Sequence, residues 1–503
     1  MDSVELLYID LFCGAGGTST GVELARIDGL KCAEVIACVN HDPHAISSHQ
    51  ANHPRTMHFT EDIRTLDLTP LMAHLERKRA EHPDALVVLW ASLECTNFSK
   101  AKGGQPRDAD SRTLAEHLFR YIEALKPDYI QIENVVEFMA WGDLDENGKP
   151  VSMDKGRLYQ KWVHSVRKYG YDFKHRILNS ADYGAYTSRK RFFGIFAKEG
   201  LPIVFPEPTH SRNPENTIFN HAEKWRPVRE VLDLKDEGES IFTRKKPLSE
   251  ATLKRIYAGL VKFVAGGREA FMIKYNSMSR KGVYHAPSME EPCPTVSTQG
   301  RLAVAKVMFL SKYFSGSPDS KNISVDEPAG TITCRDHHSF ITAYYGNGFN
   351  TSVECPSPTI TTADRFGIVT YKPFLMNPQF SSCGGDVNNP CFTLIARMDK
   401  MPPYLVTAKA GNIAIAVYST DSPTMVRIKE FMALYGIIDI KMRMLKIQEL
   451  KRIMGFPDNY ILIGTQAEQK KYIGNAVEVN MARCLCEALC RKLRTRETKI
   501  KIA

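Results

Sequence analysis

The sequence predicts an α/β fold for the first part of the chain, with a parallel sheet covered by helices on both faces. Apolar runs recur at intervals long enough for a helix, helical patterns fill several of those intervals, and a glycine-rich segment directly follows the first run. Parallel neighbours need a crossover connection, so strands separated by helices are typical of a parallel sheet.

Five apolar runs are the expected strands of this sheet. Such runs are typical of strands that are buried on both faces. A helical pattern at Thr20–Arg26 follows the first run. In chain order the runs lie at 6–12 (LLYIDLF), 35–40 (VIACVN), 85–93 (ALVVLWASL), 129–134 (YIQIEN) and 191–197 (RFFGIFA).

A different pattern follows Ala197. The segment 201–217 is rich in Pro and polar residues, which indicates a linker, and a helical pattern then occupies Ser249–Phe263. Four segments that begin with Phe next alternate with Pro-x-x-Thr segments, so we expect an internal β repeat. The Phe-initiated segments lie at 271–275, 309–314, 340–345 and 374–380, and the aligned threonines are Thr295, Thr331, Thr359 and Thr393.

Each repeat also carries an arginine at an even offset from its threonine. An even offset places both side chains on one face wherever the segment is extended. Two interpretations stay open. The arginines cap strand ends or pair with nearby acids, or they contact DNA, since Arg commonly reaches guanine through the major groove. They are Arg301, Arg335, Arg365 and Arg397.

The helical, apolar pattern returns from about Arg427, so we expect the α/β domain to resume there. The expected domains are therefore 1–205 (first part of the α/β domain), 206–427 (linker and β repeats) and 428–503 (return to the α/β domain).

Composition excludes several classes of protein. The chain has 503 residues, of which 43% are hydrophobic and 24% charged, so it is too long for one small core and close to the soluble globular average. Disordered, collagen-like and coiled-coil classes are excluded. A net charge of +9, from 66 basic and 57 acidic residues, is compatible with a polyanionic partner without requiring one.

Cysteine use and hydropathy point to a reducing, aqueous compartment. The twelve cysteines have no even spacing and form no Cys-x-x-Cys pair, so we expect free thiols and no metal site. No apolar run approaches the length of a membrane span, and the start of the sequence lacks the basic region of a secretory signal. A cytoplasmic protein with no membrane partner is expected.

The first candidate site is the glycine-rich segment Asp10–Gly17 (DLFCGAGG). Glycines let the backbone approach a ligand closely at the carboxyl edge of a parallel sheet, although they also suit a tight strand–helix turn. Asn40 and Asp42, after the second run, could hold ribose hydroxyls, and Asp62 could hold an adenine amino group.

Three further candidates lie next to the later strands. Cys95 comes after the run at 85–93 and is either a nucleophile or a small buried hydrophobe; Lys100, Lys102, Arg189 and Arg191 are the cations that could lower its pKa. Glu133 ends the run at 129–134 and could donate a proton if desolvation raises its pKa, or could be a helix N-terminal acid. Arg189-Lys190-Arg191 carries two arginines on one strand face, or is solvated surface.

In order, these segments resemble the motif series of the DNA cytosine-5 methyltransferase family. DLFCGAGG resembles its S-adenosylmethionine loop, ECTNFS its Pro-Cys-Gln loop, IENV its Glu-Asn-Val motif and SRKR its Gln-x-Arg-x-Arg motif. Two C-terminal segments extend the match: Arg443-Met444-Leu445 with MGFPD at 454–458, and YIGNAV at 472–477.

The resemblance implies a Rossmann-like, S-adenosylmethionine-dependent methyltransferase sheet that is split by an inserted, mostly-β target recognition domain, which is where the repeats fall. It implies that Cys95 adds to cytosine C6, Glu133 acts at N3, Arg191 contacts O2, and Arg189 completes the catalytic set. The implied cofactor residues are Asp10, Phe12, Gly14, Gly16, Gly17, Asn40, Asp42, Asp62, Ile63, Asn475, Ala476 and Val477. Ser99 and the four repeat arginines are the candidate DNA contacts.

Four positions depart from the family's pattern. Glu94 stands where Pro precedes the nucleophile, Thr96 and Thr187 replace Gln, and Glu478 replaces Pro after GNAV. A carboxylate beside Cys95 tends to raise its thiol pKa unless a cation offsets it. Activity is still expected, because Cys95, Glu133, both arginines and Asn475 are retained.

The leading hypothesis is a sequence-specific DNA (cytosine-5) methyltransferase of a bacterial or phage modification system, using S-adenosylmethionine and no metal. Double-stranded DNA is the expected partner, a cognate restriction endonuclease is a candidate partner, and a monomer is expected on DNA. Two alternatives remain: a DNA-binding member of the family with impaired catalysis, suggested by Glu94 and Thr96, and an RNA cytosine-5 methyltransferase.

Overall fold

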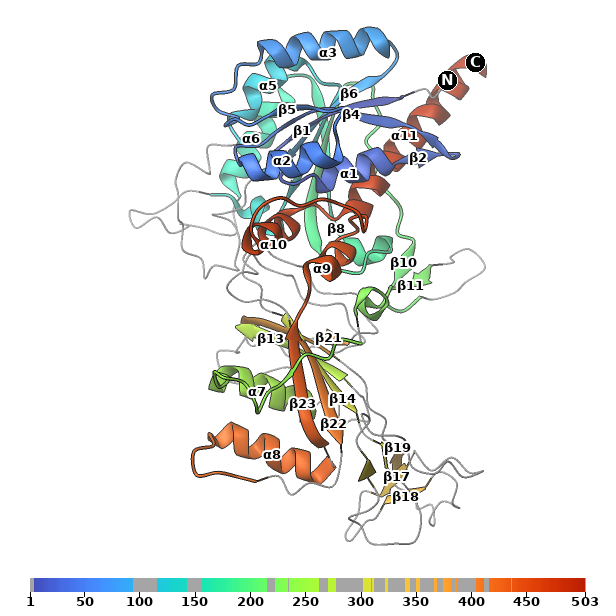
Figure 1. Ribbon diagram of the computed structural model, residues 1–503. Helices are drawn as coiled ribbons and strands as arrows, with labels where there is room; N and C mark the ends of the chain where they lie inside the picture. The colour runs from blue at the N-terminus through green and yellow to red at the C-terminus, as the bar shows by residue number, and fades with distance from the viewer. Residues whose placement is uncertain are drawn as a thin grey trace. The chain divides into compact units, whose positions relative to one another are not determined.

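The computed structural model describes residues 4–93, 115–142, 156–214, 222–233, 235–261, 416–435 and 437–502, and the backbone of strands between 270 and 410. The chain forms two compact units (Figure 1). Unit 1 is Met1–Trp225 with Lys451–Ala503, and unit 2 is Arg226–Leu450.

Unit 1 contains a seven-stranded sheet, and every strand predicted in the first 200 residues belongs to it. The order is β5 (Met57–Phe59), β4 (Ala33–Val39), β1 (Leu6–Leu11), β6 (Leu86–Ser92), β7 (Tyr129–Asn134), β9 (Lys190–Lys198) and β8 (Tyr171–Asn179). The strands from β5 to β7 are parallel, as predicted.

The predicted parallel direction does not hold for the run at 191–197. Strand β9 is antiparallel to both β7 and β8. Only the short segment 180–189 joins β8 to β9, and a connection of that length permits an antiparallel pair but no parallel crossover.

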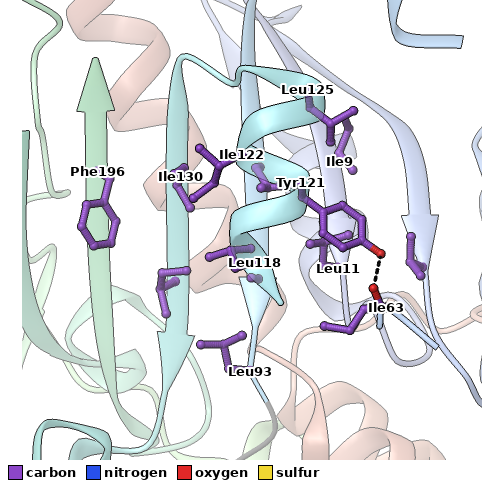
Figure 2. Packing of buried hydrophobic residues seen from close by; sticks show 14 of the residues in the cluster. Ile9, Leu11, Ile63, Leu93, Leu118, Tyr121, Ile122, Leu125, Ile130 and Phe196 are labelled. Atoms are coloured by element: carbon purple, nitrogen blue, oxygen red, sulfur yellow. Dashed lines mark hydrogen bonds between the residues drawn. The ribbon is translucent and has the colours of Figure 1, made fainter. Parts of the chain in front are cut away.

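Helices cover both faces of this sheet, because neighbouring residues of each strand point to opposite faces. Leu7, Ile9 and Leu11 of β1 pack with α3 (Thr69–Glu81), α5 (Leu118–Leu125) and α6 (Arg157–Arg167). Figure 2 shows this face around Tyr121 and Leu118. Leu6 and Tyr8 face the other way and pack with α1 (Gly17–Leu24) and α11 (Val479–Ile502).

The described part of unit 1 also contains further helices and short strand pairs. They are α2 (Pro43–Asn52), α10 (Gln466–Asn475), η2 (Val136–Ala140), η3 (Ser180–Tyr183) and the strand pairs β2 (Arg26–Ile27) with β3 (Leu30–Lys31) and β10 (His210–Ser211) with β11 (Glu223–Lys224). Across all of the described residues, no helix is both long and apolar enough to span a membrane.

Among its described residues, unit 2 contains a second seven-stranded sheet and the helices named below. The sheet order is β12 (Glu239–Ser240), β23 (Ile437–Met444), β22 (Tyr404–Ala410), β14 (Leu302–Met308), β13 (Ala270–Asn276), β20 (Phe374–Phe380) and β21 (Gly385–Asp386). The helices are α7 (Glu250–Gly259) and α8 (Pro423–Tyr435), with η4 (Val228–Val231) before them and α9 (Ile447–Ile453) at the boundary.

Both boundaries of unit 2 lie later in the chain than the boundaries of the predicted domain 206–427. Unit 2 begins at Arg226 and ends at Leu450. Strand β23 explains the second difference: Ile437–Met444 follows the expected return at 428, yet it pairs along its length with β22 of unit 2. An ion pair anchors its end, since the Arg443 guanidinium donates to both Glu449 carboxylate oxygens at 2.9 Å.

Two of the four Phe-initiated segments are neighbours in this sheet. Strands β13 and β20 pair in parallel, with Ile273 opposite Met376. A third segment begins β17 (Phe340–Ala343), which lies between β18 (Asn350–Ser352) and β19 (Phe366–Ile368) in a separate sheet, and the fourth contributes β15 (Leu310–Ser311), paired with β16 (Asn322–Ile323). The Pro-x-x-Thr segments and their arginines lie outside the described residues.

Candidate functional site at the carboxyl edge of the sheet

The glycine-rich segment forms the turn between β1 and α1. Phe12, Gly14 and Gly16 have φ angles of 60°, 52° and 98°, in the left-handed region that favours glycine. A Cβ atom built on Gly14 would meet no heavy atom within 4 Å. The backbone at Gly14 is therefore open to a ligand at the carboxyl edge of the sheet.

Gly16 and Gly17, in contrast, are closely packed in this turn. A Cβ on Gly16 would collide with the Tyr460 hydroxyl, and a Cβ on Gly17 would lie 2.5 Å from the carbonyl oxygen of Val477 and 2.9 Å from Cβ of Ala476. The structure thus brings the predicted loop against Ala476 and Val477, although these segments are far apart in sequence. Close packing is therefore sufficient to require glycine at both positions, and the positive φ is a second reason at Gly16.

The acidic and amide residues near the strand ends have structural partners. Asp10 is buried and its Oδ2 accepts a hydrogen bond from the Ser19 hydroxyl at 2.8 Å; burial raises the pKa of Asp10 to about 8. Asn40 Oδ1 accepts from the Asp42 amide at 2.9 Å. Asp42 in turn caps α2 and accepts from the Tyr472 hydroxyl at 3.0 Å.

Asp62 and Ile63 lie beyond β5 at the same edge. The Arg64 guanidinium binds both oxygens of Asp62 and lowers the pKa of that carboxyl. The Ile63 carbonyl accepts a hydrogen bond from the Tyr121 hydroxyl at 3.0 Å, which Figure 2 marks with a dashed line. These contacts fix the backbone that follows β5.

Glu133 and Arg191 form a buried ion pair. Arg191 Nε lies 3.2 Å from Glu133 Oε1, and their side chains are 10% and 8% exposed, respectively. Strands β7 and β9 are neighbours, so the carboxylate at the end of one strand meets the guanidinium at the start of the other. The pair fixes two charged groups at the carboxyl edge.

The backbone that leads to Cys95 is held beside this pair. Ser92 is opposite Glu133 in the pairing of β6 with β7, and Asn134 Nδ2 donates to the Leu93 carbonyl at 3.3 Å. Leu93 is two residues before Cys95. The predicted residues that lie outside the described part of the chain are Cys95, Ser99, Arg301, Arg335, Arg365 and Arg397, together with Glu94 and Thr96.

Arg189 takes a different direction from Arg191. It precedes β9 and its guanidinium donates to the Gly474 carbonyl at 3.2 Å, next to the predicted cofactor residue Asn475 at the end of α10. The structure therefore brings Arg191 to Glu133 and Arg189 to the C-terminal segment.

Glu478, one of the departures from the family pattern, caps α11. Its carboxylate accepts from the backbone amides of Asn480 at 3.1 Å and Met481 at 2.7 Å. Burial raises the pKa of Glu478 to about 7, although these amides and the nearby Arg189 lower it in part. Sequence reasoning missed this role, which an acidic residue just before a helical pattern could have signalled.

A raised pKa makes Glu478 a source of pH-dependent stability. Its pKa is about 7 in the folded protein against an ordinary 4.5, so its protonated form favours folding at low pH and this contribution is lost as pH rises through 7. We expect the unfolding free energy of a Glu478→Gln variant to fall less between pH 5 and pH 8 than that of the wild type, by on the order of 2 kcal/mol.

Urea titrations of both proteins at several pH values measure this difference. Asp10 also has a raised pKa, but it is present in both proteins, so the comparison isolates Glu478. Parallel pH profiles would contradict the assignment.

Sequence reasoning also missed buried cysteines and histidines behind the loop. Cys13, Cys38 and His49 come together although they lie far apart in sequence and on different elements. No spacing pattern signals them, because only the sheet order makes them neighbours.

Comparisons with known proteins identify sequence relatives of this chain. The sequence model of the family described as C-5 cytosine-specific DNA methylase matches residues 6–491. The chain is 29% identical over 244 residues to the type II methyltransferase M1.HphI of Haemophilus parahaemolyticus, covering 48% of this chain and 59% of that protein. It is 31% identical over 205 residues to M.XorII of Xanthomonas oryzae, covering 40% and 43%.

A third relative, the type II methylase M.HgiDII of Herpetosiphon aurantiacus, is 26% identical over 308 residues, covering 58% of this chain and 75% of that protein. The chain spans about half the length of the first two relatives. The family match, in contrast, includes both segments of unit 1 and extends across unit 2. The chain belongs to the C-5 cytosine-specific DNA methylase family.

Proposed function

We propose that the protein is a sequence-specific DNA (cytosine-5) methyltransferase. It transfers a methyl group from S-adenosylmethionine to C5 of a cytosine that is flipped out of duplex DNA. The observation that carries this proposal is the buried Glu133–Arg191 pair, held beside the backbone that leads to Cys95. A guanidinium fixed in position can donate to O2 of a cytosine, and a carboxyl group fixed beside it can donate to N3 when it is protonated.

The residues at the carboxyl edge fit S-adenosylmethionine. Gly14 leaves open space at a glycine turn, and the amide of Asn40 and the carboxylate of Asp62 follow the two neighbouring strands. Phe12, Asp42 and Ile63 would complete this side of the cofactor site, with Asn475, Ala476 and Val477 behind the loop. When bound there, S-adenosylmethionine supplies the methyl group as an electrophilic carbon on a sulfonium.

The chain's own residues would make C5 reactive. The Cys95 thiolate forms a bond to C6, which converts C5 into a nucleophilic enamine carbon. Glu133, which must be protonated for this step, donates a hydrogen bond or its proton to N3 as negative charge develops in the ring, and Arg191 stabilises O2. After methylation a base removes the C5 proton, the C5–C6 double bond re-forms and the thiolate of Cys95 leaves.

Recognition of a DNA site is assigned to residues 206–427. Their Phe-initiated β segments and the repeat arginines support this assignment, with Ser99 as a further DNA contact from the catalytic side. The relatives named as type II methyltransferases support a role in a modification system, with a cognate endonuclease as partner. We propose a monomer on DNA.

Label transfer tests the function directly. The protein is incubated with S-adenosylmethionine carrying a labelled methyl group and either mixed-sequence duplex DNA or tRNA. We expect label in the duplex and not in the tRNA, and a Cys95→Ala variant is expected to lose at least about 1,000-fold in rate while it keeps its DNA affinity. Cys484→Ser, a thiol on α11, is the matched control.

Each other outcome selects an alternative. Methyl transfer by Cys95→Ala at the wild-type rate would contradict the covalent mechanism. Methyl transfer to tRNA alone would favour an RNA methyltransferase. A wild-type protein that binds duplex without transferring label would favour impaired catalysis, the alternative that Glu94 and Thr96 suggest.

A further inference from the structure

A cluster of metal-ligand side chains lies directly behind the glycine turn. The Sγ atoms of Cys13 and Cys38 and a ring nitrogen of His49 all lie within 4.8 Å of one another, and all three residues are buried. His58 adds a fourth group, because its Nε2 lies 2.9 Å from His49 Nδ1. The four residues come from the turn, β4, α2 and β5.

We propose that Cys13, Cys38, His49 and His58 form a tetrahedral zinc site. Two thiolates and two imidazoles are a ligand set that Zn²⁺ binds in structural sites, at about 2.3 Å from sulfur and about 2.0 Å from nitrogen. A tetrahedron with these bond lengths places its ligand atoms roughly 3.3 to 3.8 Å apart. Side-chain adjustments on the order of 1 Å would bring the ligand atoms of Cys13, Cys38 and His49, which lie within 4.8 Å of one another, to those distances. His58 Nε2, now 2.9 Å from His49 Nδ1, would have to move slightly away from it.

Hydrogen bonds behind His49 give its ring the orientation that a ligand needs. The Ser19 hydroxyl donates to Asp10 Oδ2 at 2.8 Å, so its oxygen accepts from His49 Nε2 at 2.9 Å. With this direction of the hydrogen bond, Nε2 carries the proton of the neutral ring and the lone pair of Nδ1 is directed toward His58. Metal-bound histidines are typically held through their other nitrogen in this way, by a carboxylate or a group linked to one.

The position of the cluster gives the metal a structural role. Cys13 is adjacent to Gly14, Cys38 is two residues before Asn40, and His58 is four residues before Asp62. One ion would therefore tie the turn to the two strands whose ends carry the proposed cofactor residues. This consequence rests on the proposed function, whereas metal binding itself does not.

A second group of thiols must be distinguished from this site by experiment. Cys32, Cys486 and Cys490 also lie within 4.8 Å of one another. They offer three sulfurs and no imidazole, so their ligand set differs from that of the proposed site. Variants in each cluster distinguish the two.

Cobalt titration of the full chain tests the proposal. The protein is purified without added chelator, its zinc content is measured, and Co²⁺ is then titrated into metal-free protein. We expect one equivalent of Co²⁺ to bind at this site. The bound ion should show the strong visible absorption of tetrahedral cobalt together with thiolate charge-transfer bands. Cys38→Ser and His58→Ala should each weaken Co²⁺ binding at least about 100-fold, and Ser19→Ala about tenfold.

Three controls keep the outcome decisive. Cys490→Ser and His164→Ala, at an exposed histidine of α6, should leave Co²⁺ binding unchanged. Cys95→Ala should also leave Co²⁺ binding unchanged, so that a loss of methyl transfer can be distinguished from a loss of metal. His58 is only partly buried, so His58→Ala decides the question if Cys38→Ser fails to fold. Wild-type protein that binds no Co²⁺, or Cys38→Ser and His58→Ala variants with unchanged spectra, would overturn the proposal.

Discussion

An Arg191→Met variant is expected to lose about 3 kcal/mol of unfolding free energy and at least about 100-fold in methyl-transfer rate. Arg191 is the partner of Glu133 at 3.2 Å, and the Glu133 side chain is only 8% exposed. Removing the guanidinium leaves a buried carboxylate without its positive charge, which costs more than the ion pair itself contributes. Methionine keeps most of the length of the side chain, so the loss of unfolding free energy reflects mainly the removal of the positive charge.

Two further variants isolate the pair. Adding Glu133→Gln to Arg191→Met should recover part of the stability, because no buried charge is left uncompensated, and it should recover no activity. Arg176→Met on β8 is the matched control, since its contact with Glu207 spans 4.0 Å between exposed side chains and should contribute little. Equal stability of Arg191→Met and Arg176→Met in urea unfolding would contradict the buried pair.

A Gly17→Ala variant is expected to lose about 2 kcal/mol of unfolding free energy. Gly17 is the first residue of α1, where alanine would ordinarily be the better helix former, so any loss must come from packing. The added Cβ would lie 2.5 Å from the carbonyl oxygen of Val477, which is backbone and cannot rotate away.

Gly14→Ala provides the comparison for this prediction. Its Cβ meets open space, so only the positive φ of 52° opposes it, at a cost of about 1 kcal/mol. Gly14→Ala should therefore be the more stable variant, yet it should bind S-adenosylmethionine less tightly than the wild type. Thermal unfolding and calorimetric titration measure the two effects, and a Gly17→Ala protein as stable as the wild type would refute the packing argument.

The sequence predicted the central strands and missed others for physical reasons. Strands β1, β4, β6, β7 and β9 are largely buried along their length, so their sequences are apolar runs. Strand β8 lies at the sheet edge with exposed residues along its middle, and β5 has only three residues. Neither leaves an apolar run, and without β8 the reversed direction of β9 could not be foreseen.

At the candidate site, the motifs predicted a set of residues but not how those residues pair. Arg189 and Arg191 are two residues apart, and an extended segment would place them on one face. Because β9 begins at Lys190, Arg189 lies outside the strand and reaches Gly474 instead. Glu478 looks like a simple departure from a motif until its amide partners at the start of α11 are known.

Bisulfite sequencing of DNA from cells that express the protein tests the central claim most directly, because it detects methyl groups at cytosine C5 and shows the surrounding sequence. We expect protected cytosines at one short recognition sequence in cells with the wild-type protein and none in cells with Cys95→Ala. Folded wild-type protein that leaves every cytosine unprotected, or protection that persists with Cys95→Ala, would contradict the account.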